Sequence, residues 1–582
     1  MQWKETAAGT VLRGAQYTVR LQTGETPCLL FTFNGQTIAT FPVASAVDTP
    51  EEKEHLRNIR ILQLEASADE ARLLAQSDSN CWETHTFEWV FTKEGASFSQ
   101  EVSGCGALGR CYFLSGGRAE AYGRGDADSI EAYAHIHLPR YRPMTENLAD
   151  VTDYDVSHPG YIGIAASEQP AIRNSAFWEH NAIFTPAPFL YAFYDGDITM
   201  GIGFAAKPGS YRFNGVEYTG SQMTGAAFYV NYLGYTTFKD TYRLPSVSLH
   251  LGWSVYEVLR AHIAFVDKDG YGTARVYPPA DWHYAPIFCG WAEQTSQGEK
   301  LGVSGGNMAT QANYEEWIQL AEARGLPLGT IVIDDKWQTQ YGTFEVDTQK
   351  WPDMKKFVDA QHAKQRHVLL WVPSYHKEGV PENWCVKDAQ DNIAFADPAN
   401  PEYETFLRAQ IRHLVADIGI DGFKEDWVAA SAVTPGYMAY GDLHGLELFR
   451  RFQGILYEET HTSKPDALVE TQTPHPLFRE SSDMLRLNDI WFGNRQVCKM
   501  MQRRARIAML AGWDVLDCDN ASSTTAEQWF AYAQMQVKLG IPALYFLHET
   551  ESAHEIIDEA KWTYLTALWE QYVRENEFGT AL

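Results

Sequence analysis

The segment 419–427 ends a short apolar run with three ionisable residues, Lys424, Glu425 and Asp426. Charged groups at the end of a buried strand are costly unless they face a wet, functional cavity. A helical pattern at 403–418 precedes the segment, and another follows after a loop that contains Gly and Pro. This order of helix, strand, loop and helix is typical of a parallel barrel, whose chemistry lies where the strands end. The alternative is that the two acids occupy the first turn of a helix.

Polar and aromatic residues recur at the ends of other apolar runs. Eight strand candidates alternate with helical patterns between residues 286 and 547, which predicts a (β/α)₈ TIM barrel. Because the strand ends of a barrel converge on one mouth, acids placed there perturb each other's pKa, as acid/base and nucleophilic catalysis requires. In chain order, these candidates are Trp291, Glu293, Asp334, Asp335, Lys336, Trp337, Trp371, His376, Trp427, Glu470, Arg486, Asp489, Asp517 and Asp519.

This set of residue types fits glycoside chemistry. One of two carboxylates across a glycosidic bond can attack the anomeric carbon while the other protonates the leaving oxygen. Aromatic rings can stack on the sugar, and cationic side chains can hold its hydroxyls. The sequence shows no Ser-His-Asp arrangement, nucleophile elbow or Gly-rich phosphate loop. We therefore expect a glycosidase with no metal and no organic cofactor.

The first half of the chain has a different period. Residues 1–280 mostly alternate with a period of two between turns rich in Gly, which predicts an antiparallel β-sandwich ending in a linker helix. Residues 281–582 form the predicted catalytic barrel. A C-terminal β-sandwich is expected to be absent or vestigial. One loop of the N-terminal domain carries Trp178 and His180, which either pack in the core or form a lid over a neighbouring site.

Composition narrows the choice of partner and compartment. The chain has a net charge of −28 and 13% aromatic residues, so nucleic acid is a poor partner and a small oligosaccharide or glycoside is a good one. A homo-oligomer is compatible with the sequence. We see no signal peptide, and no apolar run reaches the about 18 residues of a membrane span. The eight cysteines form no CxxC pair, which favours a cytoplasmic setting with reduced thiols.

Residues 332–337, Val-Ile-Asp-Asp-Lys-Trp, followed by the segment 344–353, resemble the second-strand signature of glycoside hydrolase families 27 and 36 in clan D. Those families contain α-galactosidases and α-N-acetylgalactosaminidases, and family 31 is related to them more distantly. The resemblance covers residues 285–547 and implies a retaining exo-α-glycosidase.

Two acids receive catalytic roles from the same resemblance. Lys424-Glu-Asp426 resembles the Lys-x-Asp of those families, whose aspartate is the nucleophile. The segment 486–489 resembles their sixth-strand segment, whose aspartate is the general acid/base, so Asp489 receives that role. Asp483 lies at a similar spacing and is the alternative.

The remaining candidates are expected to bind the sugar. The carboxylates, lysine and arginine would exchange hydrogen bonds with hydroxyls, and the Trp rings would stack on the sugar unless they pack the barrel core. Lys336 either forms a structural ion pair beside the two aspartates or meets an anionic or N-acylated substituent. Glu470 is included without a defined role. The set is Asp334, Asp335, Lys336, Trp337, Trp291, Trp371, Lys424, Glu470 and Arg486.

Two segments depart from the family pattern and leave the sugar open. Residues 471–479 stand where family 36 usually has a Cys/Ser-Gly-Gly-Gly-Arg loop that grips the 2-substituent, and 371–374 stand where an acid is common. An α-N-acetylgalactosaminidase, an α-glycosidase for a substituted or anionic sugar, and a transglycosylase therefore stay as alternatives. So do two other classes, a Mg²⁺-dependent barrel lyase or isomerase and a carbohydrate-binding protein without turnover.

Overall fold

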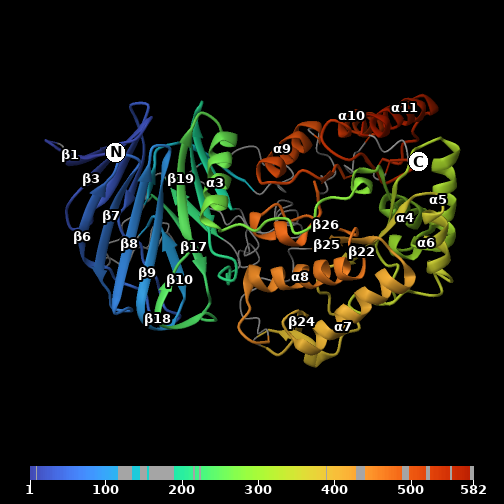
Figure 1. Ribbon diagram of the computed structural model, residues 1–582, viewed down its shortest axis with the longest axis horizontal. Coiled ribbons are helices and arrows are strands. Elements are labelled where there is room, and N and C mark those ends of the chain that lie inside the picture. The colour runs from blue at the N-terminus through green and yellow to red at the C-terminus, as the bar shows by residue number, and fades with distance from the viewer. Residues whose placement is uncertain are drawn as a thin grey trace.

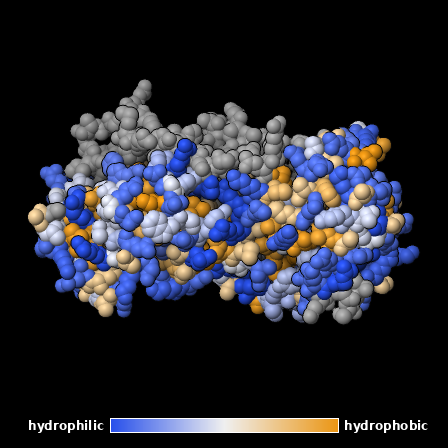
Figure 2. Space-filling model, turned by 90° about the horizontal axis from the view of Figure 1, so that it is seen from above, coloured by the Kyte–Doolittle hydropathy of each residue, from blue (hydrophilic) through white to orange (hydrophobic). Residues whose placement is uncertain are grey.

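The computed structural model shows an all-β domain beside an α/β domain (Figure 1). Hydrophilic residues cover most of the face seen in Figure 2, with smaller hydrophobic areas between them, in keeping with the acidic composition. The structure describes residues 1–7, 9–115, 134–144, 154–155, 189–213, 216–221, 225–388, 390–427, 440–487, 497–519, 525–550 and 553–576.

The N-terminal domain is built from antiparallel strands, as the period of two predicts. The strands are β1 (Trp3–Thr6), β2 (Gly9–Arg13), β3 (Tyr17–Gln22), β4 (Cys28–Phe33), β5 (Gln36–Pro42), β6 (Arg57–Ala66), β7 (Glu70–Asp78), β8 (Thr84–Thr92), β9 (Gly95–Ala107), β10 (Arg110–Phe113), β11 (His135–Ile136), β12 (Arg140–Pro143), β13 (Tyr154–Asp155), β14 (Leu190–Asp195), β15 (Ile198–Ala205), β16 (Glu217–Ser221), β17 (Gly225–Asn231), β18 (Thr237–Arg243) and β19 (Ser246–Gly252).

Two large sheets of this domain pack face to face. One has the order β1-β2-β3-β4-β5-β11, and the other has the order β13-β12-β14-β15-β19-β9-β8-β7-β6 with β18 paired to β9. A third, of three strands, has the order β10-β17-β16. Alternate apolar side chains fill the space between the sheets; the ring of Phe31 from β4 lies 6.2 Å from that of Trp89 from β8. The predicted β-sandwich is confirmed.

The C-terminal domain is a parallel barrel. Its strands are β20 (Ile287–Cys289), β21 (Thr330–Ile333), β22 (His367–Pro373), β25 (Gly422–Asp426), β26 (Leu468–Thr471), β27 (Met484–Arg486), β28 (Leu516–Asp517) and β29 (Ala543–Leu544). They pair in the order β28-β27-β26-β25-β22-β21-β20-β29, and a bridge between Asp517 and Ile541 joins the two ends of the sheet. Eight parallel strands therefore lie between residues 286 and 547, as the sequence predicts, and the barrel prediction is confirmed.

Helices separate the barrel strands and cover their outer face (Figure 1). They are α4 (Trp291–Leu301), α5 (Gln311–Ala323), α6 (Met354–His362), α7 (Pro401–Arg412), α8 (Gly445–Ser463), α9 (Val497–Leu510), α10 (Ala526–Gln536) and α11 (Glu559–Glu575), with the short turns η2 (Asp281–Tyr284), η3 (Gly305–Met308), η4 (Glu382–Trp384), η5 (His413–Ile418) and η6 (Pro476–Ser481). A hairpin, β23 (Cys385–Lys387) and β24 (Ile393–Ala396), follows β22. Among the described residues, no helix is long and apolar enough to cross a membrane.

Glycines fix the start of β25. Gly419 has a φ of 95° and ends the helical turn before it, because this left-handed conformation stops a helix at little cost only for glycine. Gly422 has a φ of 145°, and a Cβ there would lie 1.8 Å from the carbonyl oxygen of Leu468 on β26. No other residue fits that position. The segment is a strand, and the alternative of a helix N-terminus is wrong.

The sandwich packs onto the barrel through α3 (Val255–Asp269) and the loop after β15. Glu447, in the first turn of α8, accepts hydrogen bonds from the backbone N–H groups of Gly209 and Tyr211 at 2.7 and 3.1 Å. Asp267 of α3 forms an ion pair of 2.6 Å with Arg479 of η6. These contacts tie the N-terminal domain to α8 and to η6, which follows β26.

Candidate active site

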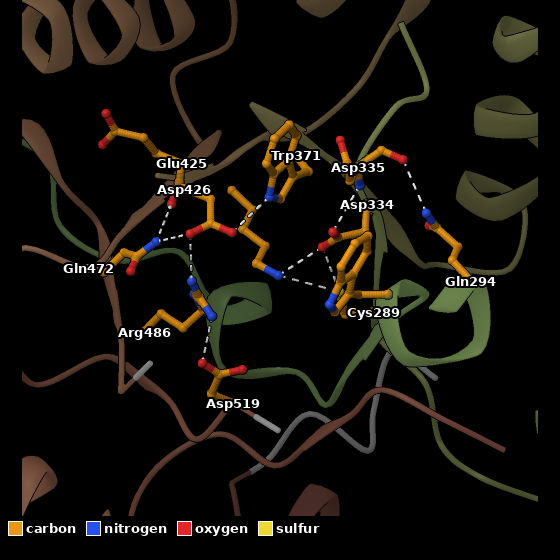
Figure 3. Close-up of polar contacts among 12 residues, drawn as sticks. Cys289, Gln294, Asp334, Asp335, Trp371, Glu425, Asp426, Gln472, Arg486 and Asp519 are labelled. Atoms are coloured by element: carbon orange, nitrogen blue, oxygen red, sulfur yellow. Dashed lines mark hydrogen bonds and ion pairs between the residues drawn. The ribbon is translucent and has the colours of Figure 1, made fainter. Parts of the chain in front are cut away.

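Side chains alternate along β25 and so face two different regions. Lys424 bonds to Asp334 at the end of β21 and Asp426 bonds to Arg486 at the end of β27, whereas Glu425 points away from the carboxylate of Asp426 (Figure 3). Glu425 instead accepts hydrogen bonds from Ser374 at 2.9 Å and from Gln453 of α8 at 2.5 Å. Burial raises the pKa of Glu425 to about 8. Glu425 is therefore a structural acid, and Asp426 is the acid of this strand that faces the mouth.

The Asp426 carboxylate is held by donors from several strand ends (Figure 3). Trp371 donates its Nε1–H to Oδ2 at 3.0 Å, while Arg486 donates to Oδ1 at 3.1 Å. Oδ1 also accepts from the backbone N–H of Trp427 at 2.9 Å and from Nε2 of Gln472. Burial alone would raise the pKa of Asp426, but the charges of Arg486 and Lys424 and these hydrogen bonds hold it below its ordinary value. Asp426 is thus an ionised, oriented carboxylate.

Lys424 is committed to the neighbouring strand end. Its Nζ donates to Oδ2 of Asp334 at 2.8 Å, and the Cys289 thiol donates to the same oxygen at 2.9 Å. Oδ1 of Asp334 accepts the backbone N–H of Asp335 at 2.8 Å. The Lys424 and Asp334 side chains are only 3% and 4% exposed, whereas Asp426 is 13% exposed. Lys424 and Asp334 therefore form a buried base for the site, and Asp426 is the more accessible acid.

Asp335 lies at the same end of β21 and is less completely bonded. Tyr341 hydrogen-bonds its side chain, and Gln294 donates to its backbone carbonyl at 3.1 Å. No described residue donates to its buried Oδ1. Burial, together with the charges of Asp334 and Asp426, raises the pKa of Asp335 to about 6. A hydroxyl of a ligand at this position would have an acceptor waiting for it.

The predicted Trp residues separate into different roles. Trp337 is fully buried and donates its Nε1–H to the backbone carbonyl of Trp371 at 2.6 Å. It packs the barrel core, which favours the core-packing alternative over a stacking role. Trp371 is also buried, but it reaches the site as a hydrogen-bond donor. Trp291 begins α4 and is half-buried against the core.

Lys336 is paired with Glu378, which lies 42 positions further along the chain. Its Nζ forms an ion pair of 2.7 Å with Glu378 and lies 3.5 Å from the centre of the Tyr341 ring. The side chains of the pair are 25% and 39% exposed. The predicted structural ion pair therefore exists, but its partner is Glu378 in the loop after β22. His376 lies in the same group, with its ring 4.9 Å from that of Tyr341.

Three residues at strand ends have left-handed backbones. Lys336, Trp427 and Asp519 have φ values of 72°, 55° and 56°, and each lies within a few residues of the end of its barrel strand. Bulky L-residues rarely adopt this conformation, and such strain is concentrated at functional sites. The strained turns aim consecutive residues at the mouth and so support the assignment of the site to this end of the barrel.

A second layer of acids lies beneath Arg486. The Arg486 guanidinium donates to Asp519 at 2.7 Å as well as to Asp426. Asp517 accepts the backbone N–H of Asp519 at 2.7 Å, and Glu470 on β26 lies beside Asp517. All four side chains are buried. Glu470 therefore faces the barrel interior but is separated from Asp426 by Arg486.

Other predicted acids lie away from the mouth or outside the described residues. Asp483 precedes β27 and is buried among donors, accepting from Val469 N–H at 2.7 Å, Tyr457 at 2.9 Å and His461 at 2.9 Å. Glu293 accepts hydrogen bonds from the chain at 547–548 and is likewise structural. Asp489, Trp178 and His180 lie outside the described residues.

Three residues of the site, Gln472, Tyr341 and Glu378, were not expected from the sequence. Gln472 lies in the segment 471–479, where the departure from the family pattern was the only signal. Tyr341 and Glu378 lie in loops after β21 and β22, and nothing in their local sequence indicates a role. Among the residues that the structure describes, no group of three or more His, Cys, Asp or Glu side chains could hold a metal ion.

Known proteins resemble this chain in part of the sequence and in fold. Residues 297–461 match the family model described as the glycosyl hydrolases family 31 TIM-barrel domain. No curated protein sequence matches this chain significantly. The closer resemblance to families 27 and 36 is not confirmed, since the matching model is that of family 31, which the sequence analysis placed at a greater distance.

Solved glycoside hydrolases share the two-domain architecture. A family 31 sulfoquinovosidase from E. rectale is 12% identical, with a TM-score of 0.57 over 99% of this chain and 84% of its own. An α-galactosidase from Lactobacillus brevis is 11% identical, with a TM-score of 0.53 over 98% and 84%. A family 31 α-xylosidase from a soil metagenome is 12% identical, with a TM-score of 0.51 over 99% and 85%. At these identities the likeness shows the fold, and with the match at 297–461 it supports a glycosidase that acts on O-glycosyl bonds.

Proposed function

We propose that this protein is a retaining, exo-acting α-glycosidase, similar to an α-galactosidase, in which Asp426 is the nucleophile. The observation that carries the proposal is the Asp426 carboxylate itself, which is ionised, held by donors on both oxygens and more exposed than the acids beneath it. Attack on an anomeric carbon requires a carboxylate in this state and orientation. In the second step the same donors would stabilise the carboxylate as it leaves the sugar.

Buried acceptors beside Asp426 support a polyhydroxylated ligand. Asp335 Oδ1 and Gln472 Oε1 are buried, and no described residue donates to either. Leaving such an acceptor unsatisfied costs free energy. Hydroxyl groups of a bound sugar would satisfy both, which gives Asp335 and Gln472 binding roles on opposite sides of the nucleophile.

We assign the general acid/base to Asp489. It follows β27, whose last residue, Arg486, contacts Asp426. The alternative, Asp483, precedes that strand at the opposite end and is fully engaged with Val469, Tyr457 and His461. A buried carboxyl group that already accepts three structural hydrogen bonds, away from the mouth, is poorly placed to give a proton to a leaving group.

The sugar is a separate question from the reaction. The similar structures are named as an α-galactosidase, an α-xylosidase and a sulfoquinovosidase. The Lys336 ammonium already has Glu378 and Tyr341 as partners, which favours its structural role over contact with an anionic substituent. A panel of p-nitrophenyl α-glycosides, containing galactose, N-acetylgalactosamine, xylose, glucose and sulfoquinovose, would identify the preferred sugar.

The nucleophile is tested by Asp426→Gly. Without the carboxylate no glycosyl-enzyme forms, so kcat/KM on an activated aryl α-glycoside should fall by several orders of magnitude. Azide should restore part of the p-nitrophenol release and yield the β-glycosyl azide. A variant that kept about a tenth of the wild-type rate would contradict the assignment. In an inhibitor complex, the carboxyl groups of Asp426 and Asp489 should lie about 5–5.5 Å apart, as retention requires.

A further inference from the structure

Glu470 is a buried acid to which no described residue gives a hydrogen-bond donor. It lies on β26, its side chain is fully buried, and neither carboxylate oxygen receives an N–H or O–H from the described part of the chain. The Asp517 carboxyl on β28 lies within hydrogen-bonding reach of Glu470. Two carboxylates can form a hydrogen bond only if one of them carries a proton.

The cations nearby do not compensate this pair. Lys424 is bonded to Asp334 at 2.8 Å, and Arg486 divides its guanidinium between Asp519 at 2.7 Å and Asp426 at 3.1 Å. Among the described residues, five inward-facing acids therefore face two cations, Lys424 and Arg486; the acids are Asp334, Asp426, Glu470, Asp517 and Asp519. Full ionisation of all five would leave an uncompensated negative charge in the barrel, which is strongly unfavourable in a buried setting.

The strand register places Asp517 beside the arginine, and Glu470 lies on the other strand that pairs with β27. β27 lies between β26 and β28, and its Arg486 is the register partner of Asp517. Asp517 in turn accepts the backbone N–H of Asp519, the residue that binds the other edge of the guanidinium. An ionised Glu470 would compete with Asp426 and Asp519 for Arg486, whereas a neutral Glu470 leaves both edges of the guanidinium to these two acids.

We propose that Glu470 and Asp517 share one proton, with Glu470 as the neutral donor, and that this pair positions Arg486 so that it orients Asp426. Glu470 and Asp517 are thus positioning residues that act on the nucleophile through the guanidinium. Burial also raises the pKa of Glu470 well above its ordinary value, and the negative charge of Asp517 raises it further. Burial raises the pKa of Asp517 to about 6. The Asp517 carboxylate accepts the Asp519 N–H, whereas no described residue donates to Glu470, so the charge of the pair lies on Asp517. The kinetic consequence rests on the proposed function, whereas the shared proton does not.

Infrared spectroscopy tests the proton without reference to activity. A protonated carboxyl group has a C=O stretch that an ionised carboxylate lacks. Glu425→Gln is the matched control, because Glu425 is also a buried acid of raised pKa but is bonded to Ser374 and Gln453, away from Arg486. We expect the isosteric Glu470→Gln to remove an acid band at neutral pH that persists in Glu425→Gln. Identical acid bands in Glu470→Gln and the wild type would overturn the proposal.

Kinetics test the positioning role. The side-chain amide of the E470Q variant can still donate to Asp517, so E470Q should keep kcat/KM within about threefold and leave the acid limb of the pH profile in place. E470A removes the side chain that donates the shared proton to Asp517; the ionised Asp517 carboxylate then attracts Arg486 away from Asp426. We expect kcat to fall ~10–100-fold and the acid limb, which reports Asp426, to move to higher pH. An unmoved limb in E470A, or an equal loss in E470Q, would refute the positioning role. A protein with no glycosidase activity but the expected infrared change would refute the proposed function alone.

Discussion

The buried ion pair between Lys424 and Asp334 should dominate the stability of the barrel interior. Its atoms are 2.8 Å apart, and the two side chains are 3% and 4% exposed. Lys424→Met keeps the length of the side chain but leaves the Asp334 carboxylate with only the Cys289 thiol and one backbone N–H. Leaving one member of a buried pair without its partner costs about 3–5 kcal/mol.

A double-mutant cycle separates the pair from its surroundings. Asp334→Asn leaves the buried Lys424 ammonium without a bonded acid among the described residues; the Tyr545 ring at 4.8 Å and the Cys289 sulfur at 3.5 Å remain beside it. The double variant removes both charges, so it should recover roughly 2 kcal/mol or more of the summed losses of the single variants. The coupling arises because each single change leaves a charge that the other change would have removed.

Urea unfolding measures these differences. Most described helices lie in the barrel, so the helical circular dichroism signal follows this domain rather than the sandwich. The midpoints should shift with little change in the slope. A loss below about 1 kcal/mol in Lys424→Met, or a double variant as unstable as the summed singles, would refute the argument.

Three further predictions concern other buried or paired groups. Asp483→Asn should lower the free energy of unfolding by about 1–3 kcal/mol, because Val469, Tyr457 and His461 lose a carboxylate acceptor. The kcat of the folded fraction should not change, and a collapse of kcat would make Asp483 the acid/base. Burial lowers the pKa of His250 to about 4, that of His475 to about 3 and that of His262 well below its ordinary value. Below about pH 6.5 these three histidines bind more protons in the unfolded chain than in the folded one, so their contribution to stability is full above that pH and is lost as the pH falls. The raised pKa of Glu425 acts in the opposite direction, so the measurement is the difference in urea midpoint between the wild type and His262→Leu, which should shrink as the pH falls. Lys336→Met breaks the partly exposed ion pair with Glu378, so it should lower the free energy of unfolding by about 0–1 kcal/mol. The kcat/KM values on plain and on anionic glycosides should change equally little. A selective loss on the anionic glycoside would support the ligand-binding role of Lys336 instead.

Local sequence was sufficient to predict the architecture. Side-chain alternation in a strand has a period of two, and helices between strands have their own period and caps, such as Asn400 before Pro401 at the start of α7. These patterns depend on neighbouring residues alone. The sandwich, the eight barrel strands and the convergence of Asp334, Lys424, Asp426 and Arg486 could therefore be predicted. The apolar run before Lys424 was enough to place Asp426 at a strand end.

Only the tertiary structure decided which groups meet. The described side-chain donors to Asp426 come from Trp371, Gln472 and Arg486, which are 46 to 60 positions away in the chain. Trp337 and Trp371 look alike in sequence, yet Trp337 packs the core and Trp371 donates a hydrogen bond to Asp426. The pairing of Lys336 with Glu378 depends on the loop after β22. The lack of a described hydrogen-bond donor to Glu470 depends on the register of β26 with its neighbouring strands. Distances across a barrel are set by closure of the whole sheet, and no local pattern contains that information.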